Sequence, residues 1–417
     1  MHLRHNIFPL LICVVLSTAD LALAGSQGWP HWRGPERTGI SRETGLLQSW
    51  PEGGPKRLWL FSNAGIGYSS FSVVNDRLYT MGARGDKEYL IAVDVTSGKE
   101  AWATEVGGLF TNNWGDGPRS TPSVDGDRVY TMGAQGTLLC AHAASGKVIW
   151  RTTMEALGGT VPGWGFTESV LVDGNQVLCT PGGEKGAIAA LEKTTGKVLW
   201  QSKDFTSGAQ YPSIIPAENH GVPQYIQLTM KSLVGIGAAD GKLLWKVPFP
   251  GQTAVIPTPI FHDGMAYITA GYGAGCKLIK IDAQQKTREI YANKKMKNHH
   301  GGVILLDDHI YGYSDGVGWA CQEFKTGKLV WNEKKQLEKG SVTCADGRLY
   351  CLGEKGGTVV LLESSTSGYK EHGRFTLDPL SKLRKPAGGI WAHPVVVDGR
   401  LYLRDQELLF CYDVKAK

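Results

Sequence analysis

A short phrase that ends in tryptophan recurs along this chain of 417 residues. Each copy combines a Gly-Lys turn with two variable residues and a Trp, and the copies end at Trp102, Trp150, Trp200, Trp245 and Trp331. The intervals are 48, 50, 45 and 86 residues, and the last is two steps of 43. A fixed period of about 20–50 residues indicates a repeat fold. The chain is therefore expected to fold as copies of one supersecondary unit.

A second phrase, typified by Asp-Gly-Arg-Leu-Tyr, marks a hairpin inside each unit. Its copies end at Tyr79, Tyr130, Leu178, Tyr225, Tyr267, Tyr311, Tyr350 and Tyr402. Apolar runs flank each copy, which is the pattern of two antiparallel strands joined by a tight turn. Two further strands flank the Gly-Lys turn, and helical periodicity is almost absent. Eight such units predict an all-β fold, an eight-bladed β-propeller of four-stranded antiparallel blades.

Three other aromatic residues fall where the period requires them. Tyr291 and Phe375 occupy the Trp position of units that lack it, and Trp59 lies 43 residues before Trp102. The last unit stops after its third strand. We therefore expect the strand around Trp59 to pair with the C-terminal blade and close the ring, since closure leaves no open sheet edge. Trp59 and the five repeated tryptophans are predicted to be structural.

Residues 1–24 match a signal peptide. Arg4 lies near the start, residues 7–16 form a short apolar run, and the Ala-Leu-Ala of residues 22–24 fits a cleavage site. No apolar run approaches the length of about 20 residues that spans a bilayer. We predict cleavage after Ala24 and a periplasmic or secreted protein with no transmembrane segment.

Composition fits one large globular body. Hydrophobic residues make up 42% of the chain, and 55 glycines serve its many turns. The net charge is +5, but the Lys and Arg residues are scattered and form no basic stripe. We expect an N-terminal extension over residues 25–54, one propeller domain over residues 55–417, no nucleic-acid partner and a monomer. Seven cysteines follow the leader, most of them in apolar strands, and are expected to be buried thiols.

The Trp phrase also carries a family resemblance. The run from Ala92 to Trp102 fits the pattern A-x-D-x-x-x-G-K-x-x-W, and the runs ending at Trp200 and Trp331 repeat it with Glu in the acidic position. This pattern resembles the repeat of the PQQ-like, quinoprotein-type β-propellers. The opening WPHWRGPERTGIS is similar to an exported bacterial subgroup of them. In length and unit number the chain resembles the propeller subunit of the outer-membrane β-barrel assembly machinery more than the quinoprotein dehydrogenases.

That resemblance implies a non-catalytic binding or scaffold propeller, with an envelope protein or a carbohydrate ligand as its partner. The alternative is a PQQ-dependent oxidoreductase, because the quinoprotein dehydrogenases hold PQQ and a calcium ion over the propeller axis. Those enzymes commonly carry two adjacent cysteines and long insertions, and this sequence has neither. We therefore predict no cofactor and no metal, with PQQ and calcium as the alternative.

Site residues are sought where the repeats differ most. The segments that enter the first strand of each unit depart sharply from one another and are rich in polar and aromatic residues. Because the first strands of a propeller converge on its axis, this variety predicts a ligand funnel. The other interpretation is a set of ordinary loops between blades. The candidate ligand-binding residues are Arg119, Glu168, Tyr211, His299, His300, Trp391 and His393.

Three kinds of chemistry are open to these residues. The three imidazoles and the carboxylate of Glu168 can bind a divalent metal ion. A His and Glu pair can serve as general acid and base. Alternatively, Arg119 with Lys339 can hold an anion such as a carboxylate or a sugar acid. No nucleophile motif, phosphate loop or dinucleotide fingerprint is present, so no catalytic residue is predicted.

Overall fold

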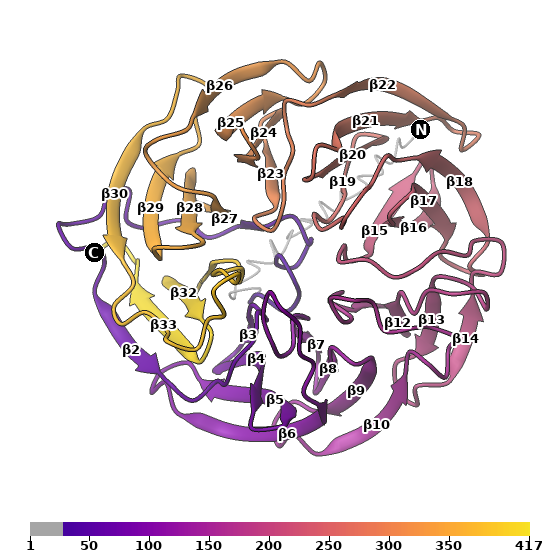
Figure 1. The fold of residues 1–417 in the computed structure, drawn as a ribbon, viewed down its shortest axis with the longest axis horizontal. Coiled ribbons are helices and arrows are strands. Elements are labelled where there is room, and N and C mark those ends of the chain that lie inside the picture. The colour runs from indigo at the N-terminus through magenta and orange to yellow at the C-terminus, as the bar shows by residue number, and fades with distance from the viewer. Residues whose placement is uncertain (1–27) are drawn as a thin grey trace, which may run out of the picture.

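Over residues 28–417, which the computed structural model describes, the chain forms a ring of eight antiparallel β-sheets. The predicted signal peptide lies outside these residues. Seen along its shortest axis, the molecule places the sheets as blades around a central axis, and the chain runs once around the ring (Figure 1). The prediction of an eight-bladed propeller with four-stranded blades is confirmed for the described part of the chain.

The blades are numbered in chain order, and the first strand of each lies nearest the axis (Figure 1). Blades 1 to 4 comprise β3 (Ser72–Val74), β4 (Arg77–Arg84), β5 (Lys87–Asp94) and β6 (Glu100–Gly108); β7 (Ser123–Asp125), β8 (Arg128–Met132), β9 (Thr137–His142) and β10 (Val148–Thr153); β11 (Leu171–Asp173), β12 (Gln176–Cys179), β13 (Ala189–Glu192) and β14 (Val198–Gln201); and β15 (Ile215–Asn219), β16 (Val222–Leu228), β17 (Ser232–Gly237) and β18 (Leu243–Pro248). Blades 5 to 8 comprise β19 (Ile260–His262), β20 (Met265–Ala270), β21 (Gly275–Ile281) and β22 (Thr287–Asn293); β23 (Val303–Leu306), β24 (His309–Ser314), β25 (Gly318–Glu323) and β26 (Leu329–Glu333); β27 (Gly340–Ala345), β28 (Arg348–Gly353), β29 (Thr358–Glu363) and β30 (Glu371–Thr376); and β31 (Val395–Val397), β32 (Arg400–Asp405) and β33 (Leu408–Asp413) with β2 (Arg57–Phe61).

The N-terminal strand closes the ring. β2 is the outer strand of blade 8 and pairs antiparallel with β33, so that Trp59 lies opposite Cys411. In Figure 1 the violet strand β2 completes the yellow C-terminal blade. The predicted closure by the strand around Trp59 is thus confirmed. The other N-terminal strand, β1 (Ile40–Ser41), adds a short parallel strand to the axial edge of blade 7.

The recurrent tryptophan joins one blade to the next. Trp59, Trp102 and Trp150 each donate the indole Nε1 hydrogen to a backbone carbonyl in the Gly-Lys turn of the following blade, at 2.8, 3.1 and 3.0 Å. The ring also lies against the glycine of that turn: a Cβ on Gly196 would come within 2.7 Å of Trp150. The glycine is required because any side chain there would collide with the ring.

In two blades another aromatic residue takes the place of the repeated tryptophan, as the spacing of the repeats predicted. Tyr291 donates its hydroxyl hydrogen to the carbonyl of Phe324 at 2.8 Å and lies against Gly327, as a blade tryptophan would. Phe375 lies against Gly54, at the start of the segment that leads into β2. Both aromatic rings therefore occupy the boundary between two blades.

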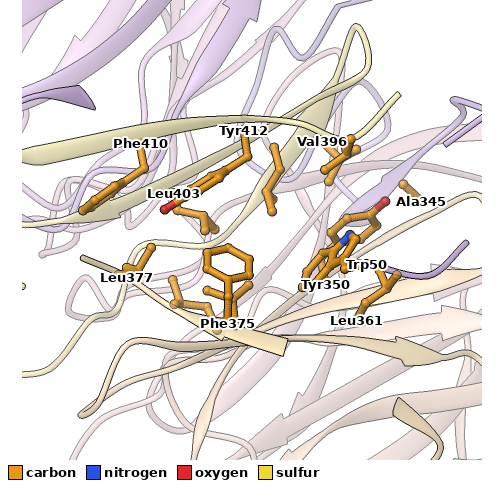
Figure 2. Packing of buried hydrophobic residues seen from close by; sticks show 14 of the residues in the cluster. Trp50, Ala345, Tyr350, Leu361, Phe375, Leu377, Val396, Leu403, Phe410 and Tyr412 are labelled. Atoms are coloured by element: carbon orange, nitrogen blue, oxygen red, sulfur yellow. The ribbon is translucent and has the colours of Figure 1, made fainter. Parts of the chain in front are cut away.

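Hydrophobic cores fill the wedges between neighbouring blades. Between blades 7 and 8, Tyr350 and Phe375 pack with Leu403 and Phe410 in one buried cluster. Figure 2 shows these side chains between the two sheets. Trp50, from the N-terminal extension, lies in the same cluster with its ring centroid 5.4 Å from that of Phe375.

The extension also crosses the propeller axis. Its residues 28–41, here called the axial segment, touch the innermost strands of several blades. Trp29 exchanges backbone hydrogen bonds with Val73 of β3 at 2.6 and 2.8 Å, and Ile40 pairs with Cys344 of β27 in blade 7. Across the axis, Nε1 of Trp32 donates to the hydroxyl of Thr258 in blade 5 at 3.1 Å. The indigo trace accordingly enters the middle of the ring in Figure 1. The axial segment is therefore built into the propeller.

All seven cysteines of residues 28–417 are buried and free, as expected from their places in apolar strands. In the same range, no helix is long and apolar enough to cross a membrane.

Candidate ligand site on the propeller axis

A cavity of about 320 Å³ opens on the propeller axis. Every blade contributes to its wall through the segment that precedes its innermost strand. The lining residues from these segments are Tyr68, Arg119, Thr167, Ser169, Tyr211, Ser213, Ile256, Pro257, Thr258, His299, His300, Gly302, Lys339, Trp391 and His393. This is the register in which the sequence predicted a funnel.

Six of the seven candidate residues come together around this cavity. They are Arg119, Tyr211, His299, His300, Trp391 and His393, contributed by four blades. Trp114, Trp164 and Lys339, which flank the candidates in the sequence, line the cavity as well.

Glu168 departs from the prediction, because it does not line the cavity. Its carboxylate is buried in the blade, where it accepts hydrogen bonds from the backbone N–H and hydroxyl of Thr180 at 2.6 and 3.1 Å. Burial raises its pKa to about 7. The cause is the alternation of an extended chain: Thr167 and Ser169 face the cavity, so the residue between them points the other way. No acid–base pair of His and Glu168 forms on the axis.

Sequence reasoning missed the parts of the wall that come from the axial segment and from loops inside two blades. Trp32 and Arg33 of the axial segment line the cavity, as do Tyr272 and Glu354 from loops within blades 5 and 7. The available signal was the run WPHWRG, which places two tryptophans and an arginine in a stretch without strand periodicity.

Stacked aromatic rings form much of the wall. The rings of Trp391 and His300 lie parallel at a centroid distance of 4.2 Å, with 16° between their planes. Tyr68 packs against the same Trp391 at 4.8 Å. Trp164 and Tyr211 stack at 5.4 Å, and the Tyr211 ring meets the His300 ring edge-on at 6.3 Å. Such faces suit flat or ring-shaped ligands, since aromatic pairs add attraction beyond buried area.

Cations outnumber acids in the wall. The described lining residues include Arg33, Arg119, Lys339 and Lys355, against the single carboxylate of Glu354. Burial raises the pKa of Glu354, which further favours a positive cavity. A site of this charge attracts anions.

Some of these cations are already balanced. The ammonium of Lys339 lies 2.8 Å from a carboxylate oxygen of Asp315. The guanidinium of Arg119 donates to the carbonyl of Gly115 at 2.7 Å, and it lies 5.4 and 5.1 Å from the ring centroids of Tyr68 and Phe110. Burial lowers the pKa of Arg119.

Three histidines of the cavity are held neutral. Burial and the nearby ammonium of Lys339 lower the pKa of His299 to about 4. Lys339 Nζ donates to Nδ1 of His299 at 2.6 Å, so the proton of this neutral ring sits on Nε2. Burial also lowers the pKa of His393 to about 3, and its Nε2 donates to the carbonyl of His300 at 2.8 Å. The pKa of His300 is lowered well below its usual range, again by burial first.

Four buried polar atoms of this wall have no hydrogen-bond partner. They are Nε1 of Trp164, Nε2 of His299, Nδ1 of His300 and Nδ1 of His393. Buried polar atoms in proteins are nearly always satisfied, so a group of unsatisfied ones in one cavity calls for ordered water or a ligand that completes them. The assigned protons make His299 a donor and His393 an acceptor for such a ligand.

The side chains that line the cavity do not supply the oxygen ligands that a calcium-bound quinone requires. Ca²⁺ takes six to eight oxygen ligands, whereas the carboxylate of Glu354 accepts a hydrogen bond from Nε1 of Trp391 at 3.1 Å. Within residues 28–417, no group of three or more His, Cys, Asp or Glu side chains is arranged to hold a metal ion. The aromatic faces and cations suit a flat acid, but not the calcium that accompanies PQQ in the dehydrogenases.

The ring of repeats with its axial cavity defines a PQQ-like β-propeller. More specifically, the model of the family described as outer membrane protein assembly factor BamB matches residues 86–333. The chain belongs to this family, and the resemblance found in its sequence is confirmed.

Individual relatives differ in activity. BamB of Burkholderia pseudomallei is 22% identical over 378 residues, which cover 84% of this chain and 86% of that protein. Tetrathionate hydrolase of Acidithiobacillus ferrooxidans is 27% identical over 238 residues, which cover 52% of this chain but only 44% of the hydrolase. The chain therefore spans less than half the length of that enzyme.

Solved structures share the fold. The crystal structure of BamB from Moraxella catarrhalis superposes with a TM-score of 0.60 at 13% identity, covering 86% of this chain and 99% of that one. Quinohemoprotein alcohol dehydrogenase from Comamonas testosteroni also gives 0.60, at 12% identity, covering 94% and 81%. One architecture thus serves an assembly factor and a dehydrogenase, so function has to be argued from the site.

Proposed function

We propose that this protein is an exported, non-catalytic propeller that binds a small ligand in its axial cavity. The observation that carries the proposal is the group of four unpartnered polar atoms between stacked rings, at the point where all eight blades of the described chain converge. A concave site with aromatic walls and a few directed polar groups is the usual form of a small-molecule site.

The state of the histidines favours binding over acid–base chemistry. With pKa values of about 4 and 3, His299 and His393 are neutral near pH 7 and release no proton there. A general acid or base works best when its pKa lies near the working pH. The rings therefore act as stacking and hydrogen-bonding groups. The PQQ-dependent alternative is disfavoured by the donor set described above.

Export rests on the leader pattern of residues 1–24. We expect the mature protein to be recovered from the periplasm or the medium and to begin at Gly25. Edman sequencing or mass spectrometry of the mature N-terminus tests this. An intact leader on the mature protein would contradict export by cleavage.

Binding titrations test the cavity itself. Sugars, sugar acids and aromatic acids are added while the melting temperature and tryptophan fluorescence are followed. A bound compound raises the melting temperature by mass action, and it changes the emission of Trp164 and Trp391. His300→Asn removes the ring stacked on Trp391 and is expected to weaken binding at least tenfold. The surface change His262→Asn is the control. Equal binding by both variants, or no binding by any compound, would place the function elsewhere.

A second candidate function is a scaffold for envelope proteins, and exposed apolar residues around the cavity mouth favour it. Trp114 is 55% exposed, Tyr272 42% and Leu383 54%. The loops of Trp114 and Leu383 are tied together by Lys385, whose Nζ lies 2.7 Å from a carboxylate oxygen of Asp116. BamB relatives that align with most of this chain are consistent with a protein partner.

Site-specific photocrosslinking separates this candidate from the first. A crosslinking amino acid at position 114 or 383 is expected to capture an envelope protein if the mouth is a docking surface. The same residue at Leu199, which is exposed on the outer edge of blade 3, is the control. Crosslinks from position 199 alone would argue against docking at the mouth.

A further inference from the structure

The axial segment supplies one buried cation to the cavity wall, Arg33. Arg33 is 6% exposed and lines the cavity. Its Nη2 donates to the backbone carbonyls of Thr38 at 2.6 Å and Val303 at 2.5 Å. These carbonyls satisfy hydrogen bonds but carry no net charge. Burial lowers the pKa of Arg33 to about 10, which leaves the guanidinium charged at neutral pH.

No acid or aromatic face balances this charge among the described residues. The ion pairs of residues 28–417 do not include Arg33, and no ring lies under its guanidinium at cation–π distance. Lys339 has Asp315, and Arg119 has two aromatic rings. A buried charge without a counterion is costly, so such residues are normally paired. Lys355 has no ion pair either, but it is exposed, so Arg33 is the buried cation of the wall with neither a carboxylate nor an aromatic face beside it.

Two glycines make room for the guanidinium. A Cβ on Gly302 would come within 2.4 Å of Nη1 of Arg33, and a Cβ on Gly39 within 2.9 Å of Nη2. Gly302 itself lines the cavity, so Nη1 reaches the wall at that point. Arg33 also has a positive φ of 64°, an uncommon conformation for a residue other than glycine. Strained residues of this kind persist where the surroundings hold them, often at ligand sites.

An unpartnered acceptor lies next to this cation. The same Cβ on Gly302 would come within 2.8 Å of Cε1 of His393, the carbon between its two ring nitrogens. His393 is 5% exposed, and its ring centroid lies 4.6 Å from that of Trp32. Its Nε2 carries the proton shared with the carbonyl of His300, so the unpartnered Nδ1 accepts. A ligand that fits here brings an anionic group for Arg33 and a hydroxyl hydrogen for His393.

We propose that Arg33 is the anion-binding residue of the axial cavity and that the ligand is a small hydroxylated organic acid, with its carboxylate on Arg33 and a hydroxyl on Nδ1 of His393. The proposal rests on the proposed function and deepens it, since it names the ligand class and assigns recognition to the axial segment. Bidentate pairing of a guanidinium with a carboxylate gives both strength and orientation. The aromatic side chains of the wall, among them Trp164, Tyr211 and Trp391, surround the rest of the ligand.

Matched pairs of probes test the ligand class on the unmodified protein. Glucuronate, galacturonate and 4-hydroxybenzoate are compared with glucose, galactose and 4-hydroxybenzamide by isothermal titration calorimetry at pH 7. At least one acid is expected to bind ten or more times tighter than its neutral partner. Neutral partners that bind as tightly as their acids would overturn the inference and leave the proposed function standing. Failure of all six to bind would overturn both.

Two variants of the axial segment test whether Arg33 binds the anion. Arg33→Gln is expected to abolish the preference for the acid while changing the Kd of the neutral partner less than about twofold. The control is Arg37→Gln, because Arg37 is equally buried in the same segment and bonds to the carbonyls of Ser169 and Val170, but does not line this cavity. Arg37→Gln should keep the preference. If Arg33→Gln keeps it too, or both variants lose it, Arg33 is not the anion-binding residue.

Discussion

At the scale of single residues, six of the eight blade boundaries in the described ring include a contact between one aromatic ring and one glycine. Trp150 is 9% exposed and lies over Gly196, and its Nε1 is bonded to the carbonyl of Lys193 at 3.0 Å. The ring therefore contributes apolar burial and satisfies one backbone acceptor of the next blade. Since both blades lose contacts when the ring is removed, these tryptophans are expected to be structural.

Trp150→Ala tests this. The change removes a buried ring and leaves a cavity, so the free energy of unfolding is expected to fall by about 3–5 kcal/mol. The matched control is Trp114→Ala, because Trp114 is 55% exposed and should cost less than about 0.5 kcal/mol. Urea unfolding followed by circular dichroism measures both values. Similar losses for the two variants would contradict the structural role.

The buried histidines make stability depend on pH. The pKa of His393 is about 3 in the folded protein and about 6.5 in an unfolded chain. Below pH 6.5 the unfolded state therefore binds a proton that the folded state does not, and stability falls as the pH falls. At pH 5 this histidine alone should cost about 2 kcal/mol relative to pH 8.

His393→Gln is accordingly expected to reduce the loss of stability between pH 8 and pH 5, whatever it does to stability at pH 8. The exposed change His142→Gln serves as the control and should leave the pH dependence unaltered. Urea unfolding at the two pH values gives the difference. An unchanged pH dependence in His393→Gln would show that the ring is protonated in the folded protein.

Single residues also show what sequence reasoning could and could not predict. The positions of Tyr291 and Phe375 followed from the period, because each must cover a turn in the next blade. Glu168 was misplaced because the repeat fixes the register of a strand but not which of two neighbouring side chains faces the axis. Trp200 differs from Trp59, Trp102 and Trp150 in its hydrogen bond. Its Nε1 donates to Gln176 of its own blade at 3.0 Å, and no sequence pattern predicts this partner.

At the scale of elements, the axial segment was the largest feature that the repeats did not reveal. It has no copy elsewhere in the chain, so no period marks it. Its two tryptophans have different surroundings: Trp29 is 2% exposed in the core between blades 8 and 1, and Trp32 lines the axial cavity. The segment ties several blades together, with bonds to Val73 of blade 1, Thr258 of blade 5 and Cys344 of blade 7.

A mature chain that begins at Arg42 lacks the axial segment but keeps Leu46, Trp50 and β2. We expect it to fold as a closed ring that is at least about 3 kcal/mol less stable, because the burial of Trp29 is lost. It should also lose the preference for acids, since Arg33 is absent. Chemical unfolding and the calorimetric probe pairs measure the two effects, with the chain beginning at Gly25 for comparison. Unaltered stability would mean that the segment does not anchor the blades.

At the scale of the whole molecule, the ring is complete only because its two ends share blade 8. β2 covers the outer edge of β33, and Nε1 of Trp59 reaches the carbonyl of Val95 in blade 1 at 2.8 Å. Without β2, β33 would present unpaired N–H and C=O groups, which promote association with other chains. Pairing of β2 with β33 therefore stabilises the boundary between blades 8 and 1, and it also covers the outer edge of β33.

Moving β2 from one end of the chain to the other tests this closure. A chain that begins at Ser62 lacks β2 and is expected to form dimers or larger species in size-exclusion chromatography with light scattering, whereas the chain beginning at Arg42 should be a monomer. In the antiparallel pairing Arg57 lies opposite Tyr412, so the start of β2 adjoins the end of β33. Residues 55–61 can therefore be appended after Val414 through a Thr-Ser-Gly-Lys turn, the connection that precedes β6 in blade 1. This rearranged chain should again be a monomer, with a melting temperature close to that of the chain beginning at Arg42. If it associates as strongly as the chain without β2, the order of the strands in sequence matters for closure and pairing with β33 alone does not suffice.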